Sequence, residues 1–371
     1  MSDTLIQYGP KGNTKEIEKT LDFIFDSNIN SPKKIRTPLC LWGTHGLGKT
    51  EMIKDYAKNR GWGFEYIAPA QFEEMGDLHG MPETTVNKDG DKITSYNPPE
   101  WVPTDEGPGI LLIDDFNRAD DRILRGCMQL LQNFELSSWK LPNKWQIVAT
   151  ANPEGGDYSV TPLDDAMLTR MIHFTLTFDP KIWAEWAIKS DVDKRGISFV
   201  LTYPELINNN RTTPRSLTQF FTLIKPIKNL KENINLVLSL ASTTLDDLTS
   251  STFVNFVNDE LQTLIEPDEI LNAIDFSKIK ISIESLSKDS EGEKRTDRLS
   301  TITTRLYLNI ISPNYKQLSN HSENLIQFLL LDCLPKDLSM SFYMDLLKYA
   351  DEKIKKMLRD KRLASFLINA M

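Results

Sequence analysis

The sequence predicts an α/β protein in which a largely parallel sheet is followed by an all-helical region. From Leu39 to about Phe178, short apolar segments alternate with segments of helical periodicity, which is typical of a parallel sheet covered by helices. Beyond Pro180 the strand signals fade, and helical periodicity continues toward the end of the chain. Its 371 residues are too many for one ordinary core, so we expect two or three domains.

The predicted elements begin with an amphipathic helix at residues 14–27, where four apolar side chains recur at helical spacing. Pro32 and Pro38 break any regular element in the connector that follows. The strongly polar residues 285–297 predict a mobile loop in the helical half. We expect the strands of the sheet at Leu39–Trp42, Phe64–Ile67, Ile110–Ile113, Trp145–Thr150 and Ile172–Leu176.

The composition is that of a soluble globular protein, with 40% apolar and 26% charged residues. No run approaches the roughly 20 apolar residues that a membrane helix needs, and the start lacks the apolar core of a signal peptide. We therefore expect a cytoplasmic protein. Three distant cysteines (Cys40, Cys127 and Cys333) favour reduced thiols, and four scattered histidines without a CxxC motif argue against a zinc site.

The net charge of −9 favours protein partners over a role in coating nucleic acid, although a local basic pore in a ring is compatible with it. The basic stretch "DEKIKKMLRDKR" near the C-terminus is more typical of a solvated helix face than of a nucleic-acid site. Nucleic acid is therefore the less favoured partner.

A phosphate-binding loop is predicted by "GTHGLGKT", which matches GxxxxGK[ST] between a strand and a helix. Glycines let successive backbone N–H groups surround phosphate oxygens, and the helix N-terminus adds its positive end. Lys49 would reach the outer phosphates of ATP, and Thr50 would hold Mg²⁺ through its hydroxyl. A chance glycine-rich turn is the alternative, but the flanking elements favour the phosphate site. The predicted binding residues are Gly43, Thr44, His45, Gly46, Leu47, Gly48, Lys49 and Thr50.

Two acids end the apolar strand in "ILLIDD". Asp114 closes the strand, where the acid of a P-loop ATPase holds the Mg²⁺ shell together with the loop hydroxyl of Thr50. Asp115 follows, where a carboxylate can orient a water molecule for attack on the terminal phosphate. The alternative is that Asp115 caps a helix or a turn, since Asp favours such places.

Three further polar residues are candidates for the same chemistry. Asn152 directly follows a strand, so its amide could hold the attacking water or touch the γ-phosphate; Asn before Pro is also a common turn. Arg170 stands between a helix and a strand, where most arginines are solvated. Arg215 begins a helix in the all-α half, where the helix dipole does not favour a cation, so an anion could compensate it.

In their order along the chain, these motifs resemble those of an AAA+ ATPase, and specifically of the MoxR-like branch, over residues 38–220. The matching stretches are "GTHGLGKT", "EEMGDLHGMPE", "YNPPEWVP", "ILLIDDFNRAD", "LPNKWQIVATANP", "ATANPEGG", "LDDAMLTR" and "TPRSLT". This branch is the bacterial type whose partners carry a von Willebrand factor A domain. Two residues depart from the family pattern: Asp115 stands where Glu is usual, and His45 where Pro or a small residue is frequent.

The resemblance implies a P-loop αβα sandwich with a parallel sheet, followed by an α-helical lid and a helical C-terminal extension. The expected parts are an N-terminal helix and connector at 1–36, the ATPase core at 37–180, the lid at 181–265 and the extension at 266–371. By motif position, Asn152 would be the first sensor, Arg170 the arginine finger of a neighbouring subunit and Arg215 the second sensor. The implied assembly is a homo-oligomeric ring, generally a hexamer, that uses ATP and Mg²⁺ to remodel or mature a protein partner.

Two hairpins are expected from the same resemblance. "ETTVNKDGDKITSY" would be an insert that turns at "NKDGDK", and "FELSSWKLPNKW" would precede the sensor strand. Both normally face the pore or a partner. Trp101 and Trp139 would then be contact residues, although burial is the more frequent use of Trp.

Three functions compete at this point. The leading one is an ATP-hydrolysing remodeller of proteins. The second is a slow-hydrolysing switch that assembles with ATP and recruits partners, as the shorter acid Asp115 suggests. The third, a nucleic-acid motor, is disfavoured by the net charge.

Overall fold

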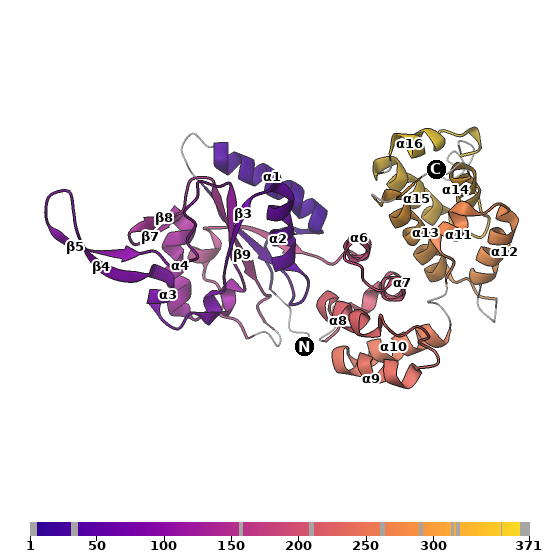
Figure 1. The fold of residues 1–371 in the computed structure, drawn as a ribbon, viewed down its shortest axis with the longest axis horizontal. Helices are drawn as coiled ribbons and strands as arrows, with labels where there is room; N and C mark the ends of the chain where they lie inside the picture. Colours follow the sequence, from indigo (N-terminus) through magenta and orange to yellow (C-terminus); the bar gives the residue numbers. More distant parts are fainter. Residues whose placement is uncertain are drawn as a thin grey trace. The chain divides into compact units, whose positions relative to one another are not determined.

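The computed structural model describes residues 6–30, 36–155, 159–207, 211–259, 264–288, 292–312, 315–316, 320–349 and 351–363. The chain divides into two compact units, Met1–Asp179 and Pro180–Met371 (Figure 1). The first unit combines helices with strands, and the second is helical in its described part.

The first unit is built on a six-stranded sheet in which every neighbouring pair is parallel. The strand order is β1 (Lys11–Gly12), β10 (Ile172–Leu176), β2 (Leu39–Trp42), β9 (Trp145–Ala151), β6 (Gly109–Ile113) and β3 (Gly63–Ile67). The five predicted strands are confirmed to within a residue at either end. Strand β1 was not predicted, because two residues at a sheet edge, Lys and Gly, carry no apolar pattern.

Both faces of this sheet are covered, which makes the first unit an αβα sandwich. Helices α1 (Thr14–Asn30) and α2 (Lys49–Arg60) lie on one face, and α4 (Asp121–Asn133) lies on the other (Figure 1). Along β2, Leu39 and Leu41 pack in the core on the face covered by α1 and α2, whereas Cys40 and Trp42 pack in the core on the face covered by α4. Such double burial explains why the strands read as continuous apolar runs rather than as alternating ones.

Two short helices complete the first unit. They are α3 (Met75–His79) and α5 (Asp165–Leu168). The side chain of Asp120 caps α4 by accepting the Ile123 N–H at 2.9 Å, and Asp164 caps α5 by accepting the Met167 N–H at 2.8 Å. These caps satisfy N–H groups that a helix start leaves without a partner.

Both predicted hairpins are confirmed. Strand β4 (Met81–Val86) pairs antiparallel with β5 (Lys92–Asn97), and β7 (Glu135–Leu136) pairs with β8 (Trp139–Lys140). The longer hairpin extends away from the sheet in Figure 1. At its turn the Asn87 side chain accepts the N–H groups of Asp89 and Asp91, at 3.0 and 2.8 Å.

The interpretation of Trp139 as a contact residue is wrong. Its side chain is 6% exposed and belongs to the core between the sheet and α4. Trp101 packs against it edge to face, with ring centroids 5.3 Å apart. The indole N–H of Trp139 donates to the carbonyl of His79 at 3.1 Å, so its polar atom is satisfied inside the fold.

The described part of the second unit consists of helices and their connections, which confirms the loss of strand signals beyond Pro180. The loop expected at 285–297 connects α12 to α13, and its residues 289–291 lie outside the described residues. The helices are α6 (Pro180–Lys189), α7 (Lys194–Thr202), α8 (Pro214–Ile224), α9 (Ile234–Thr244), α10 (Asp247–Asn258), α11 (Pro267–Asn272), α12 (Phe276–Leu286), α13 (Thr296–Ile311), α14 (His321–Leu329), α15 (Lys336–Tyr349) and α16 (Glu352–Met357).

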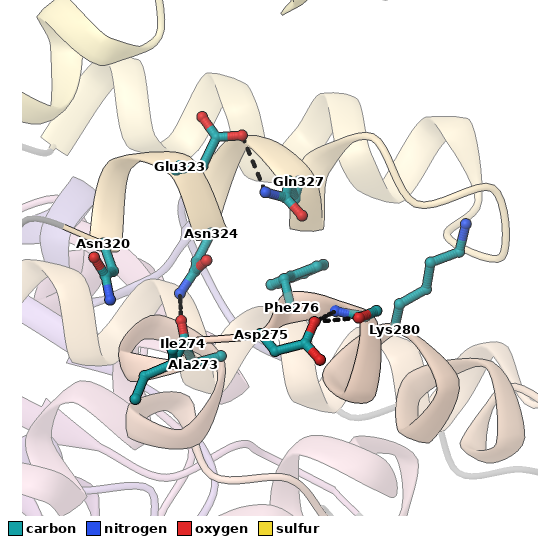
Figure 2. Close-up of a pocket in the computed structure, with 10 residues that line it drawn as sticks. Ala273, Ile274, Asp275, Phe276, Lys280, Asn320, Glu323, Asn324 and Gln327 are labelled. Atoms are coloured by element: carbon teal, nitrogen blue, oxygen red, sulfur yellow. Dashed lines mark hydrogen bonds between the residues drawn. The ribbon is translucent and has the colours of Figure 1, made fainter.

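A cavity of about 780 Å³ lies in this unit between α14 and the junction of α11 with α12 (Figure 2). Its wall is fixed by Asn324, whose amide nitrogen donates to the carbonyls of Leu271 and Ala273, each at 2.8 Å. Glu323 and Gln327 bond to each other on the same helix, at 3.0 Å. The polar side chains of α14 in this wall, Glu323, Asn324 and Gln327, therefore already have partners within the protein.

In the described part of the chain, none of the helices has the length and apolar character needed to span a membrane. Among the same residues, no cluster of three or more His, Cys, Asp or Glu side chains is arranged to hold a metal ion.

Candidate functional site

The predicted phosphate loop connects the end of β2 to the start of α2. Gly46 and Gly48 adopt left-handed conformations with φ of 70° and 94°, which favour glycine. Gly43 begins the loop in a narrow space, where an added Cβ would lie 3.1 Å from the Leu47 side chain and 3.4 Å from the Leu176 carbonyl oxygen. Gly48 stands at the N-cap of α2 without a side-chain cap, so the positive end of this helix is left open for an anion.

Lys49 is buried at the base of this loop, with 6% of its surface exposed. Its ammonium donates to the carbonyl oxygens of Gly43 at 2.7 Å and Thr44 at 3.2 Å, and to the Asn152 side-chain oxygen at 3.2 Å. A positive charge is thereby held against the loop by neutral oxygens. The arrangement provides a cation where the outer phosphates of a nucleotide would lie.

The carboxylate of Asp114 accepts hydrogen bonds from hydroxyl groups on three different elements. Its Oδ1 accepts from Thr50 at 2.8 Å and from Thr150 at 2.6 Å, and its Oδ2 accepts from Tyr66 at 3.3 Å. Partial burial together with the nearby charge of Asp114 raises the pKa of Tyr66. The Thr50 hydroxyl and the Asp114 carboxylate supply the hard oxygen ligands that Mg²⁺ prefers, so these residues fit the ion.

Asp115 turns the chain away from the sheet. It has φ 47° and ψ 42°, a left-handed conformation that Asp tolerates better than most residues, and it precedes a 3-10 turn at Phe116–Arg118. Asp115 stands at the N-cap position of this turn, as the alternative of a turn acid expects, but its carboxylate makes no capping bond to it. Instead Oδ1 accepts from the Asn152 amide at 2.8 Å, and Oδ2 lies 3.3 Å from Nε of Arg118.

Asn152 connects the loop to the second acid. Its side chain is fully buried, accepting from Lys49 through Oδ1 and donating to Asp115 through Nδ2. The buried side chain of Asn117 holds the Asn152 backbone through two bonds, accepting its N–H at 3.0 Å and donating to its carbonyl at 2.8 Å. Lys49, Asn152 and Asp115 therefore form one continuous hydrogen-bonded chain.

The hydrogen bonds of the two candidate arginines involve none of the residues of this cluster. Arg170 lies in the turn before β10, where Nε donates to Gln132 at 3.1 Å and a guanidinium nitrogen donates to the Ala166 carbonyl. Arg215 belongs to the second unit, where it is exposed on the first turn of α8 and makes no hydrogen bond or ion pair with any described residue.

Four residues of the cluster were missed by reasoning from the sequence: Tyr66, Asn117, Arg118 and Thr150. A usable signal existed for two of them. Thr150 is a polar residue near the end of a largely apolar strand, and Asn117 is a polar residue two positions after the second acid. Tyr66 and Arg118 are exposed, and nothing in their local pattern distinguishes them from other surface residues.

Comparison with known proteins identifies the fold of the first unit. Residues 38–171 match the family model of the AAA domain, dynein-related subfamily. This segment spans the phosphate loop, both acids, Asn152 and Arg170. The first unit therefore has the P-loop fold of AAA+ domains. No curated protein matches the chain significantly.

Solved structures resemble the chain only distantly. A point mutant of RuvB from Thermotoga maritima has a TM-score of 0.41 at 12% identity, over 76% of this chain and 91% of that one. RuvB from the same organism, described as a Holliday junction branch migration motor, has a TM-score of 0.38 at 13% identity, over 76% and 91%. A Cytophaga hutchinsonii protein described only provisionally as an ATPase has a TM-score of 0.34 at 15% identity, over 95% and 88%. At these values the likeness says nothing about what the chain acts on.

Proposed function

We propose that the chain, whose residues 38–171 carry an AAA domain, binds ATP with Mg²⁺ and hydrolyses it slowly. The observation that supports this most strongly is the continuous chain Lys49–Asn152–Asp115 beside the Thr50–Asp114 pair. These side chains come from the carboxyl ends of β6 and β9 and from the start of α2, which follows β2 through the phosphate loop. Ligands of open parallel sheets bind at such ends.

In this proposal the loop amides and Lys49 hold the phosphates of ATP. Thr50 and the water shell of Asp114 would hold Mg²⁺, which neutralises charge on the transferring phosphoryl group. Asp115 is the base, because a carboxylate can orient a water molecule and accept its proton. Asn152 orients Asp115 through the 2.8 Å bond and reaches Lys49 on its other side.

The proposed slowness follows from the length of the base. Asp is one carbon shorter than Glu, so its carboxylate falls back by about 1.5 Å. A misplacement of about 1 Å can reduce a rate on the order of a hundredfold. Asp115 keeps its charge, however, so hydrolysis is slowed rather than abolished. A second candidate, a nucleotide-gated assembly switch, is favoured by the position of Arg118, whose Nε lies 3.3 Å from the Asp115 carboxylate.

We further propose that Arg170 serves a neighbouring copy in a homo-oligomeric, hexameric ring. Strand β10 runs parallel to β2, with Ile172 opposite Leu39. Arg170 therefore lies near the amino-terminal ends of these two strands. The phosphate loop follows Trp42, at the carboxyl end of β2. The two ends of β2, Leu39 and Trp42, are three steps apart, or about 10 Å at 3.3 Å per step, so Arg170 is poorly placed for its own site.

The proposed substrate of the ring is a protein. The β4–β5 hairpin presents exposed apolar side chains, Met81 at 71% and Val86 at 65%, of the kind that contact a partner. A partner with a von Willebrand factor A domain is the specific expectation. The test is size-exclusion chromatography of wild type with a von Willebrand factor A domain protein encoded beside this reading frame, in the presence of ATP. Co-elution of the two proteins is expected, and separate elution would argue against this partner.

Titration with a fluorescent ATP analogue tests the nucleotide site. Lys49→Ala should bind at least about tenfold more weakly, because it removes a charged hydrogen bond worth about 1.5–3 kcal/mol. Lys54→Ala is the matched control, because Lys54 is exposed on the same helix and its substitution changes the net charge by the same amount. Equal affinities for wild type, Lys49→Ala and Lys54→Ala would overturn the assignment of the loop.

A further inference from the structure

Thr150 occupies the point at which the two acids leave the sheet. Strands β6 and β9 pair in register up to Ile113, which lies opposite Ala149. The first N–H after β6, that of Asp114, donates to the Ile67 carbonyl on β3 at 2.8 Å. Beyond this residue the left-handed turn at Asp115 carries the chain away from β9, so the Asp115 N–H needs a partner outside the strand ladder.

The Thr150 side chain supplies that partner. Its hydroxyl oxygen accepts the Asp115 N–H at 2.9 Å, and its hydroxyl proton is donated to Oδ1 of Asp114 at 2.6 Å. A single hydroxyl can donate and accept at the same time, so one side chain holds both acids. Thr150 is fully buried, so water does not compete for these bonds.

We propose that Thr150 is a positioning residue whose hydroxyl sets the Asp114 carboxylate for Mg²⁺ and the Asp115 backbone for water activation. The inference rests on the proposed ATP hydrolysis. Thr50 donates to the same Asp114 oxygen at 2.8 Å, so Thr150 also fixes which way this carboxylate faces the metal-binding hydroxyl. Thr150 itself makes no contact with substrate in this account, because it acts only through Asp114 and Asp115.

The substitution Thr150→Val isolates the hydroxyl, since Val has nearly the same shape. It leaves the Asp115 N–H without a partner and removes one donor from Asp114. Thr150→Ser is the matched control, because it keeps the hydroxyl and removes only the methyl group. Affinity for a fluorescent ATP analogue is measured in EDTA and over a Mg²⁺ titration, and ATP turnover is measured over the same titration.

For wild type we expect Mg²⁺ to tighten binding of the analogue and to permit turnover. Thr150→Val should bind within about twofold of wild type in EDTA, need about tenfold more Mg²⁺, and turn over at least about tenfold more slowly. Thr150→Ser should stay within about threefold of wild type in all three quantities, since its hydroxyl makes the same two bonds.

Three results would overturn the proposal. The first is a Thr150→Val variant that matches wild type in its Mg²⁺ requirement and turnover. The second is a Thr150→Ser variant as defective as Thr150→Val, which would assign the effect to the methyl group. The third is failure of both Thr150→Val and Thr150→Ala to fold, as judged by circular dichroism, which would assign the hydroxyl to folding. Thr150→Ala replaces Thr150→Val if only the latter fails to fold, because a water molecule then has room to reach the Asp115 N–H. A wild type that binds no ATP analogue would instead overturn the proposed function.

Discussion

The side-chain amide of Asn152 donates to the carboxylate of Asp115 across 2.8 Å, and the same side chain accepts from Lys49. Asn152 is fully buried, and its backbone is held at both polar atoms by Asn117. The orientation of the second acid is therefore fixed by a rigid element, the end of β9, rather than by a free loop. This relationship makes Asn152 the link between the phosphate loop and the proposed base.

Asn152→Ala should lower ATP turnover by about tenfold or more, because a buried hydrogen bond to a charged group is worth about 1.5–3 kcal/mol. The affinity for ATP should fall less, since Lys49 retains its two carbonyl partners. Asn143→Ala is the control, as Asn143 is exposed before β9. Steady-state phosphate release and analogue binding measure the two quantities. Equal turnover of the two variants would remove Asn152 from the mechanism.

Arg118→Ala should raise basal turnover by up to a few-fold, because it frees one oxygen of Asp115 from its 3.3 Å pair. The side chains of this pair are 43% and 39% exposed, so the effect should be small and should shrink as salt is added. Arg125→Ala removes another exposed Arg–Asp pair, with Asp121, and serves as the control. Lower turnover in Arg118→Ala than in Arg125→Ala would instead make Arg118 a support for the base.

Arg170→Ala should bind ATP almost as wild type does and hydrolyse it poorly, because Arg170 is proposed to complete the site of a neighbouring copy. Mixing it with Lys49→Ala should restore part of the activity, since some interfaces then combine an intact loop with an intact arginine. The measurement is phosphate release over a range of mixing ratios, with mixed rings verified by native mass spectrometry. Mixed rings without any recovery would show that Arg170 does not act across subunits.

The sequence was most informative where a feature depends on few neighbouring residues. The strands were predictable because burial on both faces of the sheet leaves continuous apolar runs such as Leu39–Trp42. The Thr50–Asp114 contact joins residues far apart in the chain, but each of them belongs to a short motif that the sequence shows directly. The contacts of Thr150, Asn117 and Arg118 were not predictable, because they depend on the left-handed turn at Asp115 and on where β6 leaves β9. Trp139 was misjudged because hairpin residues can face either the core or the solvent.

The second unit should lose stability as the pH falls below about 6.5 through His321. Burial lowers the pKa of His321 from 6.5, with Asp268 opposing the shift. Nε2 and Nδ1 of the ring lie 2.9 Å from the Asn272 side chain and the Tyr315 hydroxyl, a pattern that suits the neutral imidazole. Because the folded pKa is the lower one, the neutral form stabilises the fold at higher pH, and this stabilisation is lost as the pH falls through the folded pKa.

His321→Gln cannot titrate, so the pH dependence of its unfolding free energy should be shallower than that of wild type between about pH 7.5 and 5. Chemical denaturation followed by circular dichroism at several pH values measures the difference. Parallel pH profiles for the two proteins would show that His321 makes no such contribution.

The most direct test of the central claim compares ATP hydrolysis by wild type, Asp115→Asn and Asp115→Glu, with Lys49→Ala defining the background. We expect slow turnover by wild type above that background, and none by Asp115→Asn, which should still bind ATP because Asn removes only the charge of the base. Asp115→Glu should equal or exceed wild type, since its carboxylate extends about 1.5 Å further toward the water. Equal hydrolysis by wild type and Asp115→Asn would contradict the account and leave a nucleotide-gated assembly as the better one.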